Sequence, residues 1–162
     1  FPKARGDECD ECGKPLNPSD LKDLHCYLCS TSARFEASEH FFLRLSSFQN
    51  KLKAWIKEQS HWRRNVLSTT WKFLDEGLKD RAITRDINWG VTVPLPGFEQ
   101  KRIYVWFEAV IGYLSASKEW AKLHGDDLAW QPFWQGDSKS FYFIGKDNIF
   151  FHTINWPAML MG

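Results

Sequence analysis

Apolar side chains recur every three or four positions in two segments, and this spacing predicts two amphipathic helices. The first covers residues 46–59, where Ser46 or Ser47 can cap the first turn. The second covers residues 65–78, and Gly77 stands near its carboxyl end, where a glycine commonly ends a helix. Both segments have polar backs, so we expect surface helices that pack on a core through the stripes Phe48, Leu52, Trp55, Ile56 and Val66, Thr70, Phe73, Leu74.

The pattern changes in the carboxyl half of the chain. Residues 101–107 (KRIYVWF) are rich in β-branched and aromatic side chains and predict a strand, and a helix over residues 108–124 follows. Residues 141–144 predict a second strand and residues 148–160 a second helix, which Pro157 should kink or end locally. Strand, helix, strand, helix is the order expected of a parallel sheet in an α/β fold.

The segment between these halves predicts little regular structure. Residues 81–86 are expected to be extended, and residues 93–97 (VPLPG) contain two prolines and a glycine, which are typical of a turn or linker. We therefore place a domain boundary near residue 100.

Residues 1–39 are loop-rich and cannot bury a core of their own, so a cross-link or a bound metal must hold them together. Cys9 and Cys12 form one CxxC pair, and Cys26 and Cys29 form a second after thirteen intervening residues. Four thiolates in two tight turns make a tetrahedral site that suits Zn²⁺. We predict a structural zinc held by all four cysteines. Redox cysteines and a knuckle without metal are the alternatives.

The composition narrows the class of protein. A formal net charge of +1, with 25% charged and 43% hydrophobic residues, is typical of a soluble globular protein and argues against a dedicated nucleic-acid module. No apolar run is long enough to cross a bilayer and no signal peptide is present, so we expect a cytoplasmic protein with no membrane partner. Neither end resembles a natural terminus, and we expect an internal fragment of a longer protein.

Two strand-to-helix junctions carry the candidate chemistry. Gly145 and Asp147 lie where a strand ends and a helix begins, which is where ligands bind in open α/β sheets. Asp147 can accept hydrogen bonds from a ribose or simply cap the helix. Asn148, His152 and Trp156 follow at four-residue spacing and share one helix face. The other junction offers Trp106, Ala109 and Tyr113, so the two junctions could form one aromatic pocket that suits a thioether.

Several runs resemble methionyl-tRNA synthetases over the whole chain: ARGDECDECGKPL, SEHFFLRL, AITRDINWGVTVPLPG, KRIYVWFEAVIGYLSASKEW and FYFIGKDNIFFHTINWPAML. The resemblance implies a class I synthetase, whose Rossmann-type catalytic domain is interrupted by a connective insertion with zinc knuckles. Residues 1–100 would be the insertion with its helical return, and residues 101–162 the second half of the catalytic domain. The implied reaction joins methionine to ATP, with Mg²⁺, as methionyl-adenylate and then transfers methionine to tRNA(Met).

The resemblance also implies roles for single residues. Arg85, in the run ITRD, would bring positive charge to the reacting carboxylate and phosphates. Gly145 and Asp147 would contact the adenosine, with Asn148 beside both. The methionine pocket would be shaped by Trp106, Ala109, Tyr113, His152 and Trp156.

The chain lacks the HIGH-type and KMSKS-type signatures of class I synthetases, so the fragment alone should be inactive. Phe150 and Val110 stand where many members have proline. Two other readings stay open: a non-catalytic zinc-binding module that binds RNA or a protein, and another class I synthetase with a different apolar substrate.

Overall fold

The computed structural model describes residues 16, 18–26 and 28–162, and it divides the chain into two compact units, Phe1–Glu39 and His40–Gly162. In the first unit, Pro18–Asp20 form the 3₁₀ helix η1, and an isolated β-bridge joins His25 to Ser32. The bridge closes a tight turn in which Ser30 has a positive φ of 56°. Cys9 and Cys12 lie outside the described residues.

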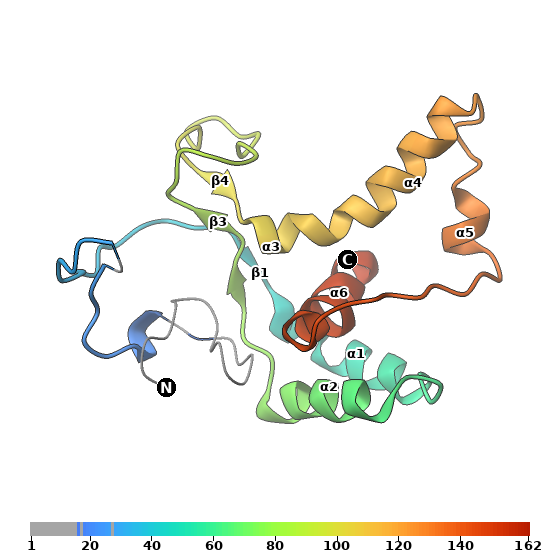
Figure 1. Cartoon of the computed structure of the whole chain (residues 1–162), viewed down its shortest axis with the longest axis horizontal. Coiled ribbons are helices and arrows are strands. Elements are labelled where there is room, and N and C mark those ends of the chain that lie inside the picture. Colours follow the sequence, from blue (N-terminus) through green and yellow to red (C-terminus); the bar gives the residue numbers. More distant parts are fainter. Residues whose placement is uncertain (1–15, 17, 27) are drawn as a thin grey trace. The chain divides into compact units, whose positions relative to one another are not determined.

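Two short antiparallel ladders open the second unit (Figure 1). Strand β1 (Phe42–Leu43) pairs with β2 (Arg81–Ala82), with Phe42 opposite Ala82. Strand β3 (Thr84–Arg85) pairs with β4 (Arg102–Ile103), with Thr84 opposite Ile103. The predicted extended stretch at residues 81–86 is confirmed by β2 and β3. The predicted parallel sheet is not, because both ladders in the described part of the chain are antiparallel.

Both amphipathic helices are present, close to the predicted bounds. A 3₁₀ turn, η2 (Leu45–Phe48), leads into α1 (Gln49–Lys57), and α2 (Arg64–Glu76) follows. Gly77 ends α2 at a φ of 83°, a left-handed conformation that favours glycine. The predicted serine cap is wrong: the hydroxyl of Ser46 donates to Asp80 at 2.6 Å instead, and that of Ser47 donates to the carbonyl of Arg44.

The predicted strand at residues 101–107 is wrong beyond Ile103. The N–H of Tyr104 still bonds to the carbonyl of Ile83, but those of Phe107 and Glu108 bond to the carbonyl of Tyr104 and start a helix. This helix runs through α3 (Val105–Glu108), η3 (Ala109–Ile111) and α4 (Gly112–Leu123). A strand persists only while a neighbouring strand accepts its hydrogen bonds, and β3 begins at Thr84, opposite Ile103 in the antiparallel ladder.

The last part of the chain holds one further helix and the predicted carboxyl-terminal helix. After α5 (Gln131–Gln135), residues 141–144 form no strand, because none of the strands described pairs with them. The 3₁₀ helix η4 (Lys146–Asn148), the π-helix η5 (Phe151–Asn155) and α6 (Trp156–Met161) make up the expected helix. Pro157 does not end it. Pro157 stands in the first turn of α6, where proline is tolerated, directly after a π turn in which the N–H of Trp156 bonds to the carbonyl of Phe151.

One core holds the second unit together. Figure 1 shows α1 and α2 side by side, with α6 next to them. Two buried hydroxyls join these parts, because Oγ1 of Thr70 in α2 lies 2.9 Å from Oγ1 of Thr153 in the π-helix. The core is made of Leu45, Leu52, Ile56, Leu74, Val110, Phe150, Phe151, Ile154, Trp156 and Ala158.

Contacts in this core cross the boundary predicted near residue 100. Ladder β3–β4 joins its two sides, and His40–Gly162 forms one compact unit. The assignment of residues 1–100 to an insertion and of residues 101–162 to the catalytic domain stays a prediction.

Candidate active site

A line of hydrogen bonds joins the two predicted junctions. Oη of Tyr113, at the start of α4, lies 2.8 Å from Nε2 of His152 in the π-helix. The other ring nitrogen, Nδ1, lies 2.9 Å from the carbonyl oxygen of Asn148. The imidazole is therefore held at both nitrogens. One partner is a side chain 39 residues away in the sequence, and the other is a backbone carbonyl four residues away. The structure thus brings together three of the residues that the sequence placed in one pocket.

The other predicted pocket residues lie nearby but in different environments. Trp106 in α3 is 47% exposed, and its ring centroid is 5.9 Å from that of Phe151. Ala109 is exposed at the start of η3. Trp156 is 5% exposed and packs edge-on against Trp134 at 5.9 Å. The prediction that His152 and Trp156 share one helix face assumed α-helical spacing. The residues from His152 to Asn155 are π-helical, so this spacing does not hold.

Gly145 and Asp147 form the turn into η4. Gly145 is the residue before the helix and has an ordinary φ of −69°, so backbone strain does not demand a glycine here. Its carbonyl accepts the N–H of Asn148 at 3.1 Å. A Cβ at this position would come 2.5 Å from Oδ1 of Asp147. Asp147 lies inside the first turn and not at the capping position, so its exposed carboxylate is not the helix cap that the sequence allowed.

The guanidinium of Arg85 in β3 contacts two backbone carbonyls and an aromatic ring. Its guanidinium donates to the carbonyl oxygens of Ala82 and Thr84 at 3.0 and 2.9 Å. The guanidinium carbon lies 3.8 Å from the ring centroid of Tyr104, which is a close cation–π contact. The sequence did not single out Tyr104. It follows directly after β4 and two residues after Arg102, the partner of Arg85, which is the diagonal placement that cross-strand pairing produces.

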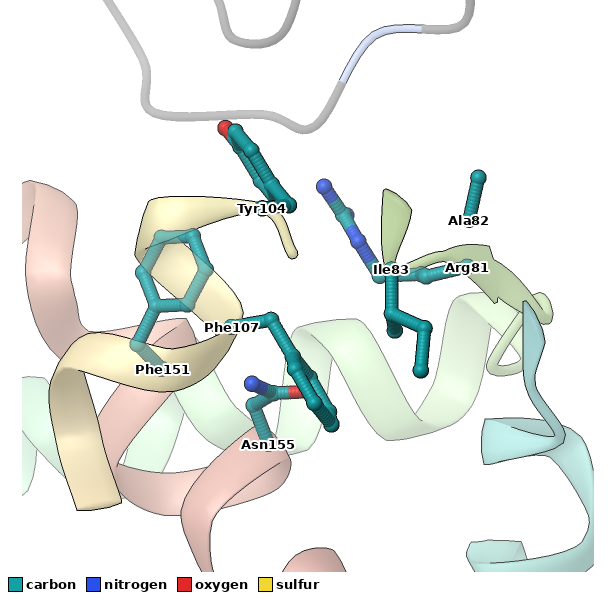
Figure 2. A pocket seen from close by; sticks show the side chains of 7 residues that line it. All are labelled: Arg81, Ala82, Ile83, Tyr104, Phe107, Phe151 and Asn155. Carbon is teal, nitrogen blue, oxygen red and sulfur yellow. The ribbon is translucent and has the colours of Figure 1, made fainter. Parts of the chain in front are cut away.

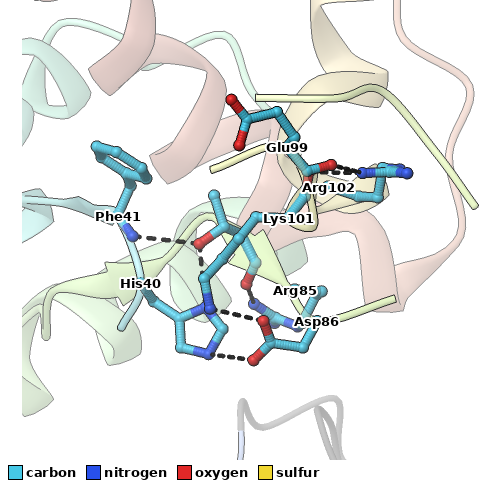
Figure 3. Close-up of polar contacts among 8 residues, drawn as sticks. His40, Phe41, Arg85, Asp86, Glu99, Lys101 and Arg102 are labelled. Carbon is cyan, nitrogen blue, oxygen red and sulfur yellow. Dashed lines mark hydrogen bonds and ion pairs between the residues drawn. The ribbon is translucent and has the colours of Figure 1, made fainter. Parts of the chain in front are cut away.

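A polar cluster lies beside Arg85 on the same strand (Figure 3). Oγ1 of Thr84 accepts the N–H of Phe41 at 3.1 Å and lies 3.0 Å from Nδ1 of His40. Asp86 pairs with Lys101 at 2.6 Å and lies 3.6 Å from Nε2 of His40. The cluster ties the beginning of the second unit to the strand that carries Arg85.

A shallow hollow opens between the β2–β3 segment and the helices (Figure 2). None of the residues predicted to bind ligands lines it, but several of their chain neighbours do. The lining residues are Arg81, Ala82, Ile83, Tyr104, Phe107, Phe151 and Asn155.

Sequence reasoning missed Tyr142. Its ring centroid lies 5.2 Å from that of Tyr113 and 5.5 Å from that of His152. No sequence pattern distinguishes it, because residues 141–143 are all aromatic. The structure does, since Phe141 and Phe143 are 79% and 94% exposed and Tyr142 between them is 41% exposed.

The described cysteine pair lies in an exposed turn, and the described residues contain no cluster of three or more His, Cys, Asp or Glu side chains that could hold a metal ion. Cys26 and Cys29 are free and exposed, and the N–H of Cys26 bonds to the carbonyl of Thr31 at 2.8 Å. Hydrogen bonds to Thr31, and then to Cys26, lower the pKa of the Cys29 thiol. A thiolate is the form that binds zinc, so the described half of the predicted site fits the metal. Cys9 and Cys12 lie outside the described residues.

Comparison with known proteins identifies the family. The family model described as tRNA synthetases class I (M) matches residues 1–162. The chain belongs to this family. As a class I synthetase segment, it is similar to "Methionine--tRNA ligase" of Dehalococcoides mccartyi (strain CBDB1), with 64% identity over 98% of the chain, and to that of Thermoplasma acidophilum, with 52% identity over 100% of the chain. The chain spans only 29% and 30% of the length of these two relatives.

A solved structure agrees with this membership. The Mycobacterium tuberculosis methionyl-tRNA synthetase in complex with methionyl-adenylate shares 26% identity, with a TM-score of 0.68 over 92% of this chain and 29% of that one. The mixture of helices and short strands is thus that of a class I synthetase catalytic domain. Membership over the whole chain favours a synthetase over a non-catalytic zinc module. Among the helices described, none is long and apolar enough to cross a membrane.

Proposed function

We propose that this segment belongs to a methionine–tRNA ligase. The enzyme joins the methionine carboxylate to the α-phosphate of ATP, releases pyrophosphate, and transfers methionine from the adenylate to tRNA(Met) in the cytoplasm. The observation that carries the proposal is the Tyr113–His152 pair at 2.8 Å, inside a chain whose relatives are named methionine–tRNA ligases. A purely aliphatic substrate would need no such polar pair, which weighs against a class I synthetase for another apolar amino acid.

The methionine side chain would lie among Trp106, Ala109, Tyr113, His152 and Trp156. Trp106 and Tyr113 are 47% and 40% exposed, so their ring surfaces are open to a ligand. Sulfur packs favourably on the edges of aromatic rings, which suits a thioether better than a branched alkyl group.

ATP would bind at the turn into η4, where the carboxylate of Asp147 is exposed and can accept hydrogen bonds from ribose hydroxyls. Gly145 and Asn148 flank that carboxylate. Arg85 would place a fixed positive charge near the reacting carboxylate and phosphates, together with Mg²⁺ bound to the substrate. Such a reaction depends on positioning and on stabilising charge, and it needs no covalent protein nucleophile.

Zinc would be a structural staple of residues 1–39, held by Cys9, Cys12, Cys26 and Cys29. The lowered pKa of Cys29 supports this, because it favours the thiolate. Native mass spectrometry of freshly purified protein tests it. One zinc per chain is expected, and four reduced cysteines without zinc would refute it.

The enzymatic proposal is tested by methionine-dependent exchange of pyrophosphate into ATP, measured on the full-length protein that contains this segment. His152→Ala and Trp106→Ala should each raise the KM for methionine by about tenfold or more, since each removes a ring of the pocket. The KM for ATP should change little.

Two variants outside the pocket serve as matched controls. His124→Ala removes a histidine whose Nδ1 also lies near a backbone carbonyl, that of Trp120 at 2.8 Å. Trp120→Ala removes a tryptophan of similar exposure, 43% against 47% for Trp106. Both should retain the methionine KM of the wild type. Exchange driven by another amino acid, or equal effects of pocket and control variants, would refute the proposal.

A further inference from the structure

The ring of His152 has a defined tautomer. A carbonyl oxygen only accepts hydrogen bonds, so the 2.9 Å contact with Asn148 requires the proton of the neutral ring on Nδ1. Nε2 is then the acceptor, and the hydroxyl of Tyr113, 2.8 Å away, must donate to it. The hydroxyl hydrogen of Tyr113 is consequently engaged, and the oxygen of Tyr113 faces outward as an acceptor.

Tyr142 packs on both partners of this hydrogen bond. Its ring meets the ring of Tyr113 at an interplanar angle of 75° and that of His152 at 64°, both in edge-to-face geometry. The rings of Tyr113 and His152 are themselves 5.6 Å apart. Three rings from the start of α4, the π-helix and the segment before η4 thus contact one another pairwise.

This contact bears on the orientation of Tyr113, because Tyr142 and His152 both pack against its ring. Tyr113 is 40% exposed. Edge-to-face pairs limit the tilt of both rings, and a shift of about 1 Å would break a hydrogen bond of this length. Of the three aromatic residues at positions 141–143, Tyr142 is the least exposed.

We propose that Tyr142 is a positioning residue of the methionine pocket, whose ring supports those of Tyr113 and His152 and keeps the Tyr113 hydroxyl directed at Nε2 of His152. The methionine side chain would then meet the edges of these rings. This inference rests on the proposed function for its substrate, but the tautomer itself does not depend on activity.

Imidazole nitrogen NMR of the full-length protein with ¹⁵N-labelled histidine tests the tautomer directly. The chain has five histidines, and the signal lost in His152→Gln assigns the residue. A wild-type spectrum with a protonated Nδ1 and a bare Nε2 is expected. A proton on Nε2 in the neutral ring would overturn the proposal without any variant at position 142.

Steady-state exchange kinetics test the positioning role. Tyr142→Leu should raise the KM for methionine by about two- to tenfold, the range expected for one or two lost aromatic pairs, with kcat and the KM for ATP little changed. The Nε2 signal of His152, which reports the hydrogen bond from Tyr113, should shift in the same variant. Tyr142→Phe is the matched control, which keeps the ring and should restore both readouts.

The two proposals fail differently. A wild-type protein without methionine-dependent exchange would contradict the proposed function alone. Exchange in which Tyr142→Leu leaves both the methionine KM and the His152 spectrum unchanged would overturn the role of Tyr142. A Tyr142→Phe variant as defective as Tyr142→Leu would also overturn it, because the ring would then not be the responsible group.

Discussion

The buried hydroxyl pair between α2 and the π-helix offers a sharp test of the fold around the site. Thr70 and Thr153 are 0% and 4% exposed. Thr153 donates its single hydroxyl hydrogen to the carbonyl of Ile149 at 2.9 Å, so Thr70 is the donor in the 2.9 Å bond between them. Thr70 also lies 2.8 Å from the carbonyl of Val66, which can accept its hydrogen if Thr153 is removed.

This arrangement sets the size of the effect. Thr70→Val keeps the shape but breaks the shared bond, which should lower the free energy of unfolding by about 1 kcal/mol. Thr153→Val breaks the shared bond and also its own bond to the carbonyl of Ile149, so its loss should be about 1 kcal/mol larger. The double variant loses the shared bond only once. Its loss should therefore match that of Thr153→Val and not the sum of the two single losses, and a double-mutant cycle should return a coupling of about 1 kcal/mol.

Urea unfolding followed by tryptophan fluorescence measures these values. All nine tryptophans lie between Trp55 and Trp156, so the signal reports on the unit His40–Gly162. Ser68→Ala in α2 is a control, since its exposed hydroxyl bonds only locally, to the carbonyl of Asn65, and it should change stability by less than about 0.5 kcal/mol. Strictly additive losses in the double variant would refute the hydrogen bond between α2 and the π-helix.

Four further predictions concern the core, the site and the cysteine turn. Leu74→Ala should cost about 2–5 kcal/mol of stability in urea unfolding, because Leu74 is 0% exposed; a loss below about 1 kcal/mol would argue against this core. Tyr113→Phe should raise the methionine KM about fivefold through one lost hydrogen bond of about 1 kcal/mol, and an unchanged KM would refute its role. Arg85→Lys should slow exchange about tenfold or more with unfolding unaffected, since lysine cannot reproduce the fork or the stacking; full activity would contradict the assignment. After removal of metal, Thr31→Val should move the pH profile for the reaction of Cys29 with iodoacetamide to higher pH, because hydrogen bonds to Thr31 lower the pKa of the Cys29 thiol; identical profiles for the variant and the wild type would contradict the role of Thr31.

Local pattern was enough for the features that depend on local interactions. Helices α1 and α2 form where the apolar stripes predict them, and Gly77 ends α2 in a left-handed conformation. Amphipathic spacing specifies which face of a helix is buried, and a helix makes its backbone hydrogen bonds within its own segment. The placement of Tyr113 and His152 on two predicted helices was within reach for the same reason, but their contact joins residues 39 apart and depends on how the helices pack.

Strands were harder, because their hydrogen bonds are made by residues far away in the chain. Residues 101–107 and 141–144 have strand-like composition, yet the first yields a two-residue strand and a helix, and the second yields no strand. Composition indicates that a residue fits a pleated surface, not that a neighbouring strand is present to pair with it.

The sequence by itself determined the family, the main helices and the residue types available at the site. Only the tertiary structure decided that a π turn precedes Pro157, that Tyr142 packs on His152, and that the guanidinium of Arg85 stacks on Tyr104. Periodicity describes where a side chain points on its own element. Which ring or carbonyl it meets depends on how elements distant in the sequence pack together.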